Sequence, residues 1–432
     1  MTIAAENPVP AFCLRDVRAL DESGGFTEPT DVLVQSGRVV SVGGSVTAKV
    51  ASLDGAGLWL MPGIVDCHTH LGSYCGEDPA EMMSVSITRW TAGALGAARQ
   101  LLAMGVTMAR DPGSCDAGIR DGIEAGDAPG PVMRVSGTAL SQTGGHTDGY
   151  VPSIGGEAYG GFFVPDHPNR GPYRADGEAG VRGAVRELIR LGVDWIKLCT
   201  TGGLVSDRRD HPLQQEFTDE EIAAAVDEAS RAGIPVCAHA YGGSGLEAAI
   251  EAGARSIEHG LHLTEEQAEL MAQSGCWLVP TLASVEELVQ LLETDELTPE
   301  TREKVREVEA VSGRQIEVAL AAGVPIALGS DLYRPGGNLN ELPLLREAGM
   351  GAEEVLLAAT AGGAELLGEG EARGRLAPGF VFDAILLDRD PGDLGAFRQA
   401  DAVTAVFQAG AAIRPHERWR DAGLPLPEVT IG

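Results

Sequence analysis

The sequence predicts an α/β fold, and three observations on its 432 residues support that prediction. Short β-rich runs alternate with helical stretches through the middle of the chain, the runs are apolar on both faces, and most of the helices end in glycine. Strands that are apolar on both faces are typical of parallel sheets covered by helices. Eight such runs predict a closed (β/α)8 TIM barrel, with an open doubly wound sheet as the alternative.

The barrel strands are expected at eight places along the chain. These runs are 63–68, 106–110, 131–136, 193–198, 234–239, 254–259, 276–281 and 324–331. Six of them follow a helix whose final glycine is expected to adopt the left-handed conformation, which stops the helix and turns the chain into the next strand. These glycines are Gly105, Gly192, Gly233, Gly253, Gly275 and Gly323.

Both ends of the chain differ from its middle. Residues 1–60 and 375–432 carry short apolar runs between Gly, Ser and Asp turns and show no helical period. We expect them to pair into one small composite β-sandwich domain beside a catalytic barrel formed by residues 61–374. The segment 136–180 is long and rich in Gly, Pro and aromatic residues, which predicts an ordered lid loop over the barrel.

The composition excludes several classes of partner. Acidic residues outnumber basic ones by 63 to 32, and the formal net charge is -31. Such a chain repels phosphate backbones and anionic lipid surfaces, so no nucleic acid or membrane partner is expected. The first ten residues do not resemble a secretory signal, and no uncharged apolar stretch reaches about 18 residues. We therefore expect a cytoplasmic protein whose seven scattered cysteines are reduced.

Candidate metal ligands stand at the ends of the predicted strands, where barrel active sites lie. The first strand ends in His68 and His70, the fifth in His239, the sixth in His259 and the eighth in Asp331. Residues i and i+2 of a strand face the same side, so the first two histidines can chelate one metal. A single histidine is more often a hydrogen-bonded core residue. Four histidines and an aspartate at one rim favour a metal centre.

Lys197 ends the fourth predicted strand, in the apolar run VDWIKL. A buried, unpaired ammonium is costly, and a protonated lysine cannot ligate a cation. Burial beside positive charge favours the neutral amine, which can react with carbon dioxide to give an anionic carbamate with two oxygens. The alternative is a structural ion pair with Asp194 or Asp331.

These residues resemble the amidohydrolase superfamily, and the resemblance covers nearly the whole chain. The chain looks most similar to the branch with prolidase-like and imidazolonepropionase-like enzymes. The matching pieces are the HxH of VDCHTH, Lys197, His239 in CAHAYG, His259 in SIEHG and Asp331 in ALGSD. The resemblance implies two divalent metal ions, with zinc as the expected metal. It assigns the first ion to His68, His70 and Asp331, the second to His239 and His259, and a bridging role to carboxylated Lys197. A mononuclear site is an alternative.

The chemistry expected of such a centre is hydrolysis by metal-activated water. Divalent cations lower the pKa of water from near 16 to about 7, and Asp331 would take the proton and pass it to the leaving group. We expect cleavage of a C–N amide bond in an N-acyl amino acid, an Xaa-Pro-like dipeptide, or an aryl amide or carbamate. Hydrolysis of a cyclic amide or lactone, or an isomerisation or decarboxylation, is an alternative. A metal-free binding or scaffold protein is a third.

Substrate contacts are predicted at two further positions. His146 in TGGHTD resembles a residue that hydrogen-bonds the scissile carbonyl in related hydrolases, and Tyr241 in HAYG resembles a tyrosine that binds the substrate carboxylate. Asp111 in ARDPG is expected to support the metal ligands from behind, with simple turn chemistry as the alternative. His416 is expected to be solvated. The partners expected are a small-molecule substrate and further copies of the chain in a homo-oligomer.

Overall fold

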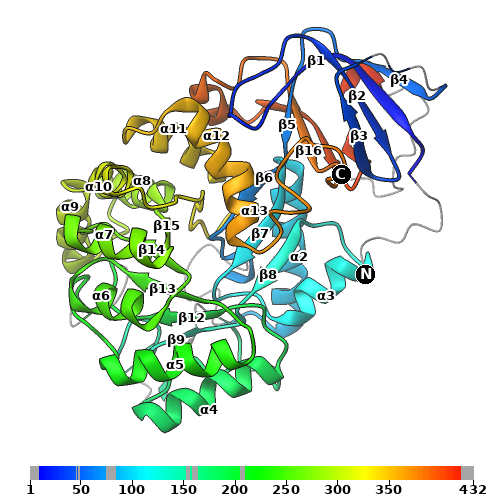
Figure 1. Ribbon diagram of the computed structural model, residues 1–432. Coiled ribbons are helices and arrows are strands. Elements are labelled where there is room, and N and C mark those ends of the chain that lie inside the picture. The colour runs from blue at the N-terminus through cyan, green and yellow to red at the C-terminus, as the bar shows by residue number, and fades with distance from the viewer. Residues whose placement is uncertain are drawn as a thin grey trace.

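The computed structural model describes residues 9–44, 46, 49–73, 84–151, 156–157, 164–204 and 210–419. Within this part of the chain, seven of the eight predicted runs form parallel strands, and helices follow them on the outside (Figure 1). The arrangement is an α/β fold of the TIM-barrel type. None of the described helices is both long and apolar enough to cross a membrane.

The parallel strands form two sheets. One has five strands in the order β15-β14-β13-β12-β9, and the other has three in the order β6-β7-β8. Their bounds are β6 Ile64–Asp66, β7 Val106–Asp111, β8 Val132–Val135, β9 Ala139–Leu140, β12 Ile196–Cys199, β13 Val236–Ala240, β14 Ser256–His259 and β15 Trp277–Val279. The third predicted run, 131–136, corresponds to β8. After it the chain turns at Gly137, whose φ is 72°, and forms β9 beside β12, outside the predicted run.

The eighth predicted run, 324–331, does not form a regular strand. A single parallel bridge joins Ile326 to Leu278 in β15. On its other side, the backbone N–H of Asp331 donates to the carbonyl of His68 at 2.7 Å. The run therefore lies between the two parallel sheets and contacts both, but it leaves the extended conformation at Asp331, whose φ is 55°.

Helices surround the parallel strands in Figure 1. Their bounds are α2 Ile87–Ala103, α3 Ala117–Ala125, α4 Gly177–Arg190, α5 Asp219–Arg231, α6 Gly243–Ala252, α7 Glu265–Ser274, α8 Leu282–Gln290, α9 Pro299–Glu309, α10 Arg314–Ala322, α11 Glu341–Glu347, α12 Ala352–Leu357 and α13 Gly363–Leu366. A π-helical turn, η4, covers Ala358–Gly362. All six predicted helix-ending glycines have left-handed φ angles, from 69° at Gly275 to 102° at Gly105, which confirms that expectation.

Strands from the two chain ends form one mixed sheet, at the top right of Figure 1. Its order is β18-β17-β16-β5-β1-β2-β3, and β4 pairs with β1. Antiparallel pairing of β5 with β16 places Pro62 opposite Ala384, so strands from the two ends of the chain pair with each other. The bounds are β1 Phe12–Ala19, β2 Thr30–Gln35, β3 Arg38–Val42, β4 Ala51–Asp54, β5 Trp59–Pro62, β16 Ala384–Leu387, β17 Val403–Gln408 and β18 Ala411–Arg414.

This mixed sheet has an aromatic core of its own. The rings of Phe12, Phe382 and Phe407 lie within 5.7 Å of one another, centroid to centroid. His416 is buried near this core with 5% exposure, its ring 5.3 Å from that of Trp419, so the expectation that His416 is solvated was wrong. The residues after β18 turn back and pack on the mixed sheet, which encloses the imidazole.

The predicted lid, 136–180, lies partly outside the described residues. Its described part contains β9 and a short hairpin of β10 (Tyr150–Val151) and β11 (Gly156–Glu157). The backbone of Ser141 pairs with the backbones of Tyr173 and Ala175, which ties the end of this segment to its beginning. All six described cysteines are buried and free, in agreement with the expectation of reduced thiols.

Candidate metal centre and active site

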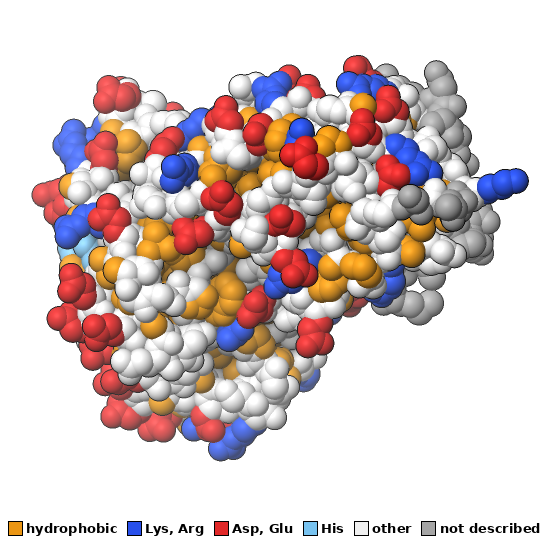
Figure 2. Space-filling model, turned by 45° about the horizontal axis from the view of Figure 1, so that its top comes forward, with side chains coloured by type: hydrophobic (Ala, Val, Ile, Leu, Met, Phe, Trp, Pro, Cys, Tyr) orange, Lys and Arg blue, Asp and Glu red, His pale blue; other side chains and the backbone are white. Residues whose placement is uncertain are grey.

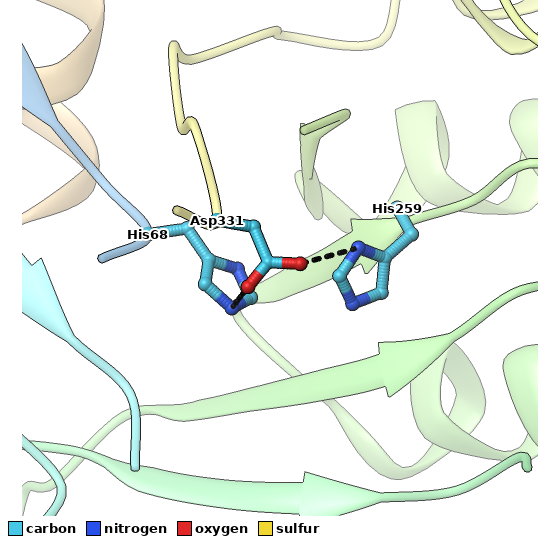
Figure 3. A group of neighbouring side chains, drawn as sticks. All are labelled: His68, His259 and Asp331. Carbon is cyan, nitrogen blue, oxygen red and sulfur yellow. Dashed lines mark ion pairs between the residues drawn. The ribbon is translucent and has the colours of Figure 1, made fainter. Parts of the chain in front are cut away.

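Asp331 brings together three of the predicted metal ligands (Figure 3). Its Oδ1 lies 3.0 Å from His70 Nε2 and 3.4 Å from His68 Nε2, and its Oδ2 lies 4.0 Å from His259 Nδ1. One ligand atom from each of His68, His259 and Asp331 can be chosen so that all lie within 4.8 Å of one another. The three imidazoles are buried, and 15% of the aspartate side chain is exposed. The arrangement forms a polar centre at the strand ends.

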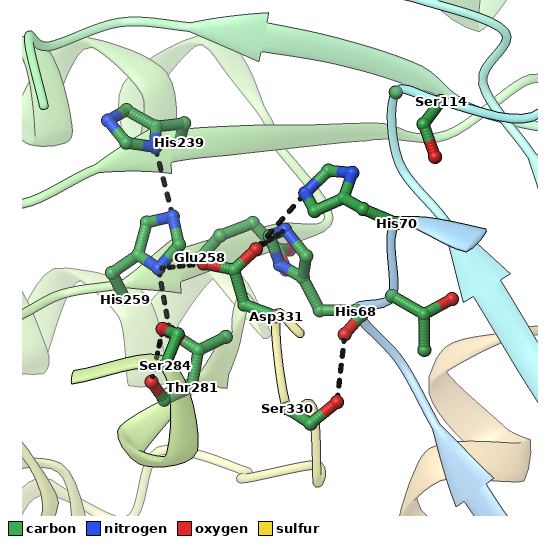
Figure 4. Close-up of polar contacts among 12 residues, drawn as sticks. His68, His70, Ser114, His239, Glu258, His259, Thr281, Ser284, Ser330 and Asp331 are labelled. Atoms are coloured by element: carbon green, nitrogen blue, oxygen red, sulfur yellow. Dashed lines mark hydrogen bonds and ion pairs between the residues drawn. The ribbon is translucent and has the colours of Figure 1, made fainter. Parts of the chain in front are cut away.

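His239 extends this centre from the next strand. Its Nδ1 lies 2.9 Å from His259 Nε2 (Figure 4). Its Nε2 lies 3.0 Å from the carbonyl of Gly202. The Gly202 oxygen can only accept, so Nε2 carries the proton of the neutral ring and Nδ1 keeps the lone pair. The structure therefore places these ring nitrogens of His239 and His259 side by side, 2.9 Å apart.

The backbone at the strand ends is shaped for these side chains. His259, Thr281 and Asp331 all have left-handed φ angles, of 73°, 55° and 55°. Such angles cost roughly 1–3 kcal/mol for residues other than glycine, and they gather at functional sites. At His259 the left-handed conformation ends β14 and lets the imidazole Nδ1 reach Thr281 Oγ1 at 2.7 Å.

Lys197 lies on β12, beside these histidines, and is 1% exposed. One predicted alternative was an ion pair with Asp194, but that carboxylate accepts from Arg120 Nη1 at 2.8 Å and from the backbone N–H of Val135 at 3.0 Å. Among the described residues, Lys197 forms no ion pair. Its amine is therefore buried next to the metal-ligand candidates, where its charge acts on Asp331 without an ion-pair contact.

The protonation states fit a cation site. Burial lowers the pKa of His68, His239 and His259 well below that of a free imidazole, and the nearby Lys197 lowers the pKa of all three further. These rings are neutral near pH 7 and keep a lone pair. Burial alone would raise the pKa of Asp331, but the basic neighbours, His68 first among them, hold it below its usual value. The site therefore offers neutral imidazoles and an ionised carboxylate.

The two ring nitrogens of His68 both face acceptors. Nδ1 lies 2.6 Å from Glu258 Oε2, so Nδ1 carries the proton of the neutral ring. Nε2 is then a lone pair 3.4 Å from Asp331 Oδ1, which is also an acceptor. Two such acceptors repel each other unless a cation lies between them. The donor set therefore fits a divalent metal ion, for which imidazole and carboxylate are usual ligands.

Glu258 is a residue of this site that the sequence reasoning missed. Its carboxylate is fully buried and contacts both His68 and Arg110, the latter at 2.7 Å. A signal was present in the sequence, because a glutamate in the apolar run ARSIEH and an arginine in the apolar run VTMAR are each costly to bury alone. Two opposite charges in buried strands predict that the two side chains form an ion pair.

His146 stacks on the predicted ligand His239, with ring centroids 4.3 Å apart and planes 20° from parallel. Its Nδ1 lies 2.9 Å from Asp210 Oδ2, and its backbone N–H donates to Glu216 Oε1 at 2.6 Å. Burial would lower the pKa of His146, but the hydrogen bond to Asp210 and the negative charges of Asp210 and Glu216 together outweigh burial and raise it. Burial raises the pKa of Glu216 to about 7, despite the opposing charge of His146. His146 is thus held at the edge of the centre by two acidic residues.

Tyr241 covers the second pair of histidines. Its ring stacks on that of His259 at 5.0 Å and meets the edge of His239 at 4.9 Å. The sequence reasoning missed Tyr333, whose ring stacks on His70 at 5.2 Å and is 36% exposed. Tyr333 follows the predicted ligand Asp331 by two residues in the chain, and this short separation in sequence was the available sign that it lies at the site.

Asp111 supports the loop that follows the first two histidines. Its Oδ2 accepts from the backbone N–H of Leu71 at 2.7 Å, and its Oδ1 accepts from the backbone N–H of Ser114 at 2.6 Å. Leu71 comes directly after His70 in the chain. Asp111 therefore stabilises the turn that follows it, which is the turn role given above as the alternative. The same carboxylate also holds the backbone next to His70.

The chain is similar to several known hydrolases. The family model described as "Amidohydrolase family" matches residues 59–413. Ochratoxinase from Aspergillus niger is 36% identical over 364 residues, which cover 81% of this chain and 75% of the relative. Imidazolonepropionase from Streptomyces griseus is 27% identical over 417 residues, which cover 90% and 93% of the two chains. A solved prolidase in complex with N-methylphosphonate-L-proline superimposes with a TM-score of 0.85 at 30% identity, covering 94% and 100%.

The chain therefore belongs to the amidohydrolase family, in the branch with prolidase-like and imidazolonepropionase-like enzymes. It is a metal-dependent hydrolase of C–N amide bonds. This agrees with the chemistry that the sequence predicted and with a centre of neutral imidazoles around one carboxylate.

Proposed function

We propose that this enzyme cleaves the amide bond of an N-acyl amino acid or an Xaa-Pro-like dipeptide, or that of an aryl amide or carbamate, at a centre of two zinc ions. The names of its relatives support this substrate range, since they include an ochratoxinase and a prolidase. The observation that carries the proposal is the pair of facing acceptors, His68 Nε2 and Asp331 Oδ1, 3.4 Å apart.

In this proposal each zinc ion has its own ligands. His68, His70 and Asp331 hold the first ion, and His239 and His259 hold the second. Support comes from the contacts of Asp331 with the first pair and from the 2.9 Å approach of His239 Nδ1 to His259 Nε2. A carbamate on Lys197 would supply two oxygen ligands and would give its buried side chain the negative charge that the cations require.

When bound, the divalent ions polarise the scissile carbonyl and lower the pKa of water at the site to about 7. Asp331 would accept a proton from the attacking water and would then protonate the leaving nitrogen. Its depressed pKa suits it to begin the cycle as an ionised base. His146 donates from Nε2 to the carbonyl oxygen, because its Nδ1 is committed to Asp210. Tyr241 orients the substrate carboxylate.

Metal analysis of the purified protein tests the proposal. We expect about two zinc ions per chain, loss of activity on chelation and recovery on adding zinc. A panel of N-acyl amino acids, Xaa-Pro dipeptides, aryl amides and lactones then identifies the substrate class. A fully folded protein that binds no divalent ion under metal-replete conditions would contradict the proposal.

The role of Lys197 needs a separate test. Lys197→Ala should lose at least one of the two ions and most of its turnover, and dialysis at low pH under carbon dioxide-free conditions should lower the activity of the wild type reversibly. Bicarbonate should restore the wild type only. Full metal content and full activity in Lys197→Ala would show that the lysine does not bridge the ions.

We also propose that the two parallel sheets close into one eight-stranded barrel through residues 324–331, and that the chain divides into a barrel of 61–374 and a β-sandwich of 1–60 and 375–432. The contacts of Ile326 with Leu278 and of Asp331 with His68 support the closure. The pairing of β5 with β16 supports the division.

A further inference from the structure

Arg110 and Glu258 form a buried ion pair inside the parallel strands, next to the candidate metal centre. Both side chains are 0% exposed, and Arg110 Nη2 donates to Glu258 Oε1 at 2.7 Å. A second nitrogen of the guanidinium, Nε, donates to the carbonyl of Cys67 at 2.6 Å. The guanidinium also lies 4.5 Å from the ring centroid of Trp195. Partners from three separate segments of the chain thus hold Arg110 in one position.

Glu258 links this pair to His68. Its Oε1 accepts from Arg110 Nη2 at 2.7 Å and from Ser256 Oγ at 2.6 Å. Its Oε2 lies 2.6 Å from Nδ1 of His68, and both residues are labelled in Figure 4. Each carboxylate oxygen therefore has its own hydrogen-bond partners. Because a buried carboxylate without partners is strongly disfavoured, Arg110 supplies the opposite charge that Glu258 needs at this position beside the imidazole.

The hydrogen bond at Nδ1 determines which nitrogen of His68 can bind a metal. A carboxylate only accepts, so the imidazole proton resides on Nδ1 and the lone pair is on Nε2. Nε2 is the nitrogen that faces Asp331 Oδ1. Without the carboxylate, the ring could place its proton on Nε2 or rotate, and either change would remove the lone pair from the centre.

We propose that Glu258 is a positioning residue for metal binding, which fixes His68 in the tautomer that presents Nε2, and that Arg110 acts through it. The inference rests on the proposed function, in which His68 holds a metal ion. The affinity of the centre for its metal then depends on an ion pair that touches neither the metal nor the substrate.

Zinc affinity, measured on the full-length metal-free protein by competition with a chelator, tests this inference. In Glu258→Gln the affinity should fall about 10- to 100-fold, the effect usual for a residue that orients a metal ligand. Because this variant leaves Arg110 unpaired, the double variant Arg110→Met with Glu258→Gln is measured beside it. It should fold and show a loss of the same size as Glu258→Gln alone.

A matched control is available at another buried ion pair, that of Arg373 with Asp383, which lies outside the centre. Asp383→Asn should lower the melting temperature and leave the zinc affinity unchanged. A metal-free readout is the tautomer of His68 in protein labelled with ¹⁵N-histidine, with the signal assigned through His68→Asn. The wild type should carry its proton on Nδ1, and Glu258→Gln should shift the ring toward the other tautomer or a mixture.

The outcomes separate the two proposals. A wild type that binds no zinc would overturn the proposed function. A wild type that binds zinc, together with folded Glu258 variants whose affinity stays within twofold and whose His68 tautomer is unchanged, would overturn this inference alone.

Discussion

The chemistry of this site depends most directly on one residue, Asp331. It contacts His70 Nε2 at 3.0 Å, and it is ionised despite its burial. Asp331→Asn keeps the shape of the side chain but removes the base. We expect kcat at saturating zinc to fall by about 10²- to 10⁴-fold, the range for loss of a general base. Steady-state kinetics together with metal analysis check this, and unchanged turnover in a metal-loaded variant would assign the proton transfer to another group.

Asp66 positions the backbone on both sides of the centre. Its carboxylate accepts from the backbone N–H of His68 at 3.1 Å and from the backbone N–H and hydroxyl of Ser330 at 3.0 and 2.6 Å. Asp66→Ala leaves these buried donors unsatisfied, at a cost of about 1–3 kcal/mol for each group. We expect a matching loss in the free energy of unfolding, measured in urea. Ser330→Ala removes one of these bonds and should cost less. Equal stability of Asp66→Ala and the wild type would contradict this role.

The predicted ligands could be found from the sequence because each is the last residue, or nearly the last, of an apolar run. Glu258 could not be found in this way. Alternation along a regular strand places neighbouring residues on opposite faces, so a reading that points His259 into the centre points Glu258 away. The left-handed φ of 73° at His259 breaks this alternation, and both side chains serve the site.

At the scale of the elements, the starts and ends of helices follow local chemistry. Helix α5 begins with a capping box in which Thr218 Oγ1 accepts from the backbone N–H of Glu221 and the Glu221 carboxylate accepts from the backbone N–H of Thr218. We expect Thr218→Ala to lower the free energy of unfolding by about 0.5–2 kcal/mol and to leave zinc content unchanged. Thr218→Ser keeps the hydroxyl and should behave like the wild type. Equal losses in the two variants would show that the methyl group, and not the cap, matters.

A close approach of two loops fixes His146. A Cβ added to Gly203 would lie 2.0 Å from His146 Cε1, so Gly203→Ala must displace the imidazole. Since a shift of about 1 Å at a catalytic group costs on the order of 10²-fold in rate, we expect a loss of that size in kcat/KM. Gly183→Ala on α4 is the control, because a Cβ there meets nothing within 4 Å. Normal kinetics in Gly203→Ala would mean that His146 does not contact the substrate.

The eighth predicted strand shows where local patterns stop being sufficient. The six helix-ending glycines could be predicted because the left-handed conformation that ends a helix depends on the residue at that position alone. The run 324–331 is as apolar as a strand, yet it makes only single bridges to its neighbours. The contacts that replace the ladder, such as Asp66 with Ser330, join residues 264 positions apart, and no local pattern encodes them.

For the molecule as a whole, the net charge bears on binding partners, and the pairing of strands bears on the fold. The net charge of the chain is -31, and Figure 2 shows Asp and Glu side chains spread over one face. This charge affects which partners the protein can bind and does not determine the fold. That strands from the two chain ends pair could be predicted, because both ends carry short apolar runs between turn residues. The exact partners, β5 with β16, could not, because register depends on packing across strands more than 300 residues apart.

The metal-free and metal-bound forms should differ in stability across the whole molecule. In the metal-free protein, Asp331 Oδ1 and His68 Nε2 face each other as acceptors, and a bound cation converts that repulsion into attraction. A ligand that binds only the folded state stabilises it by about 4 kcal/mol at 1,000 times its Kd. We therefore expect chelation to lower Tm by several degrees in calorimetry, with recovery on adding zinc. His68→Ala with His259→Ala should show no response to zinc. A wild-type Tm that is the same with and without metal would mean that the strand ends are not joined through a cation.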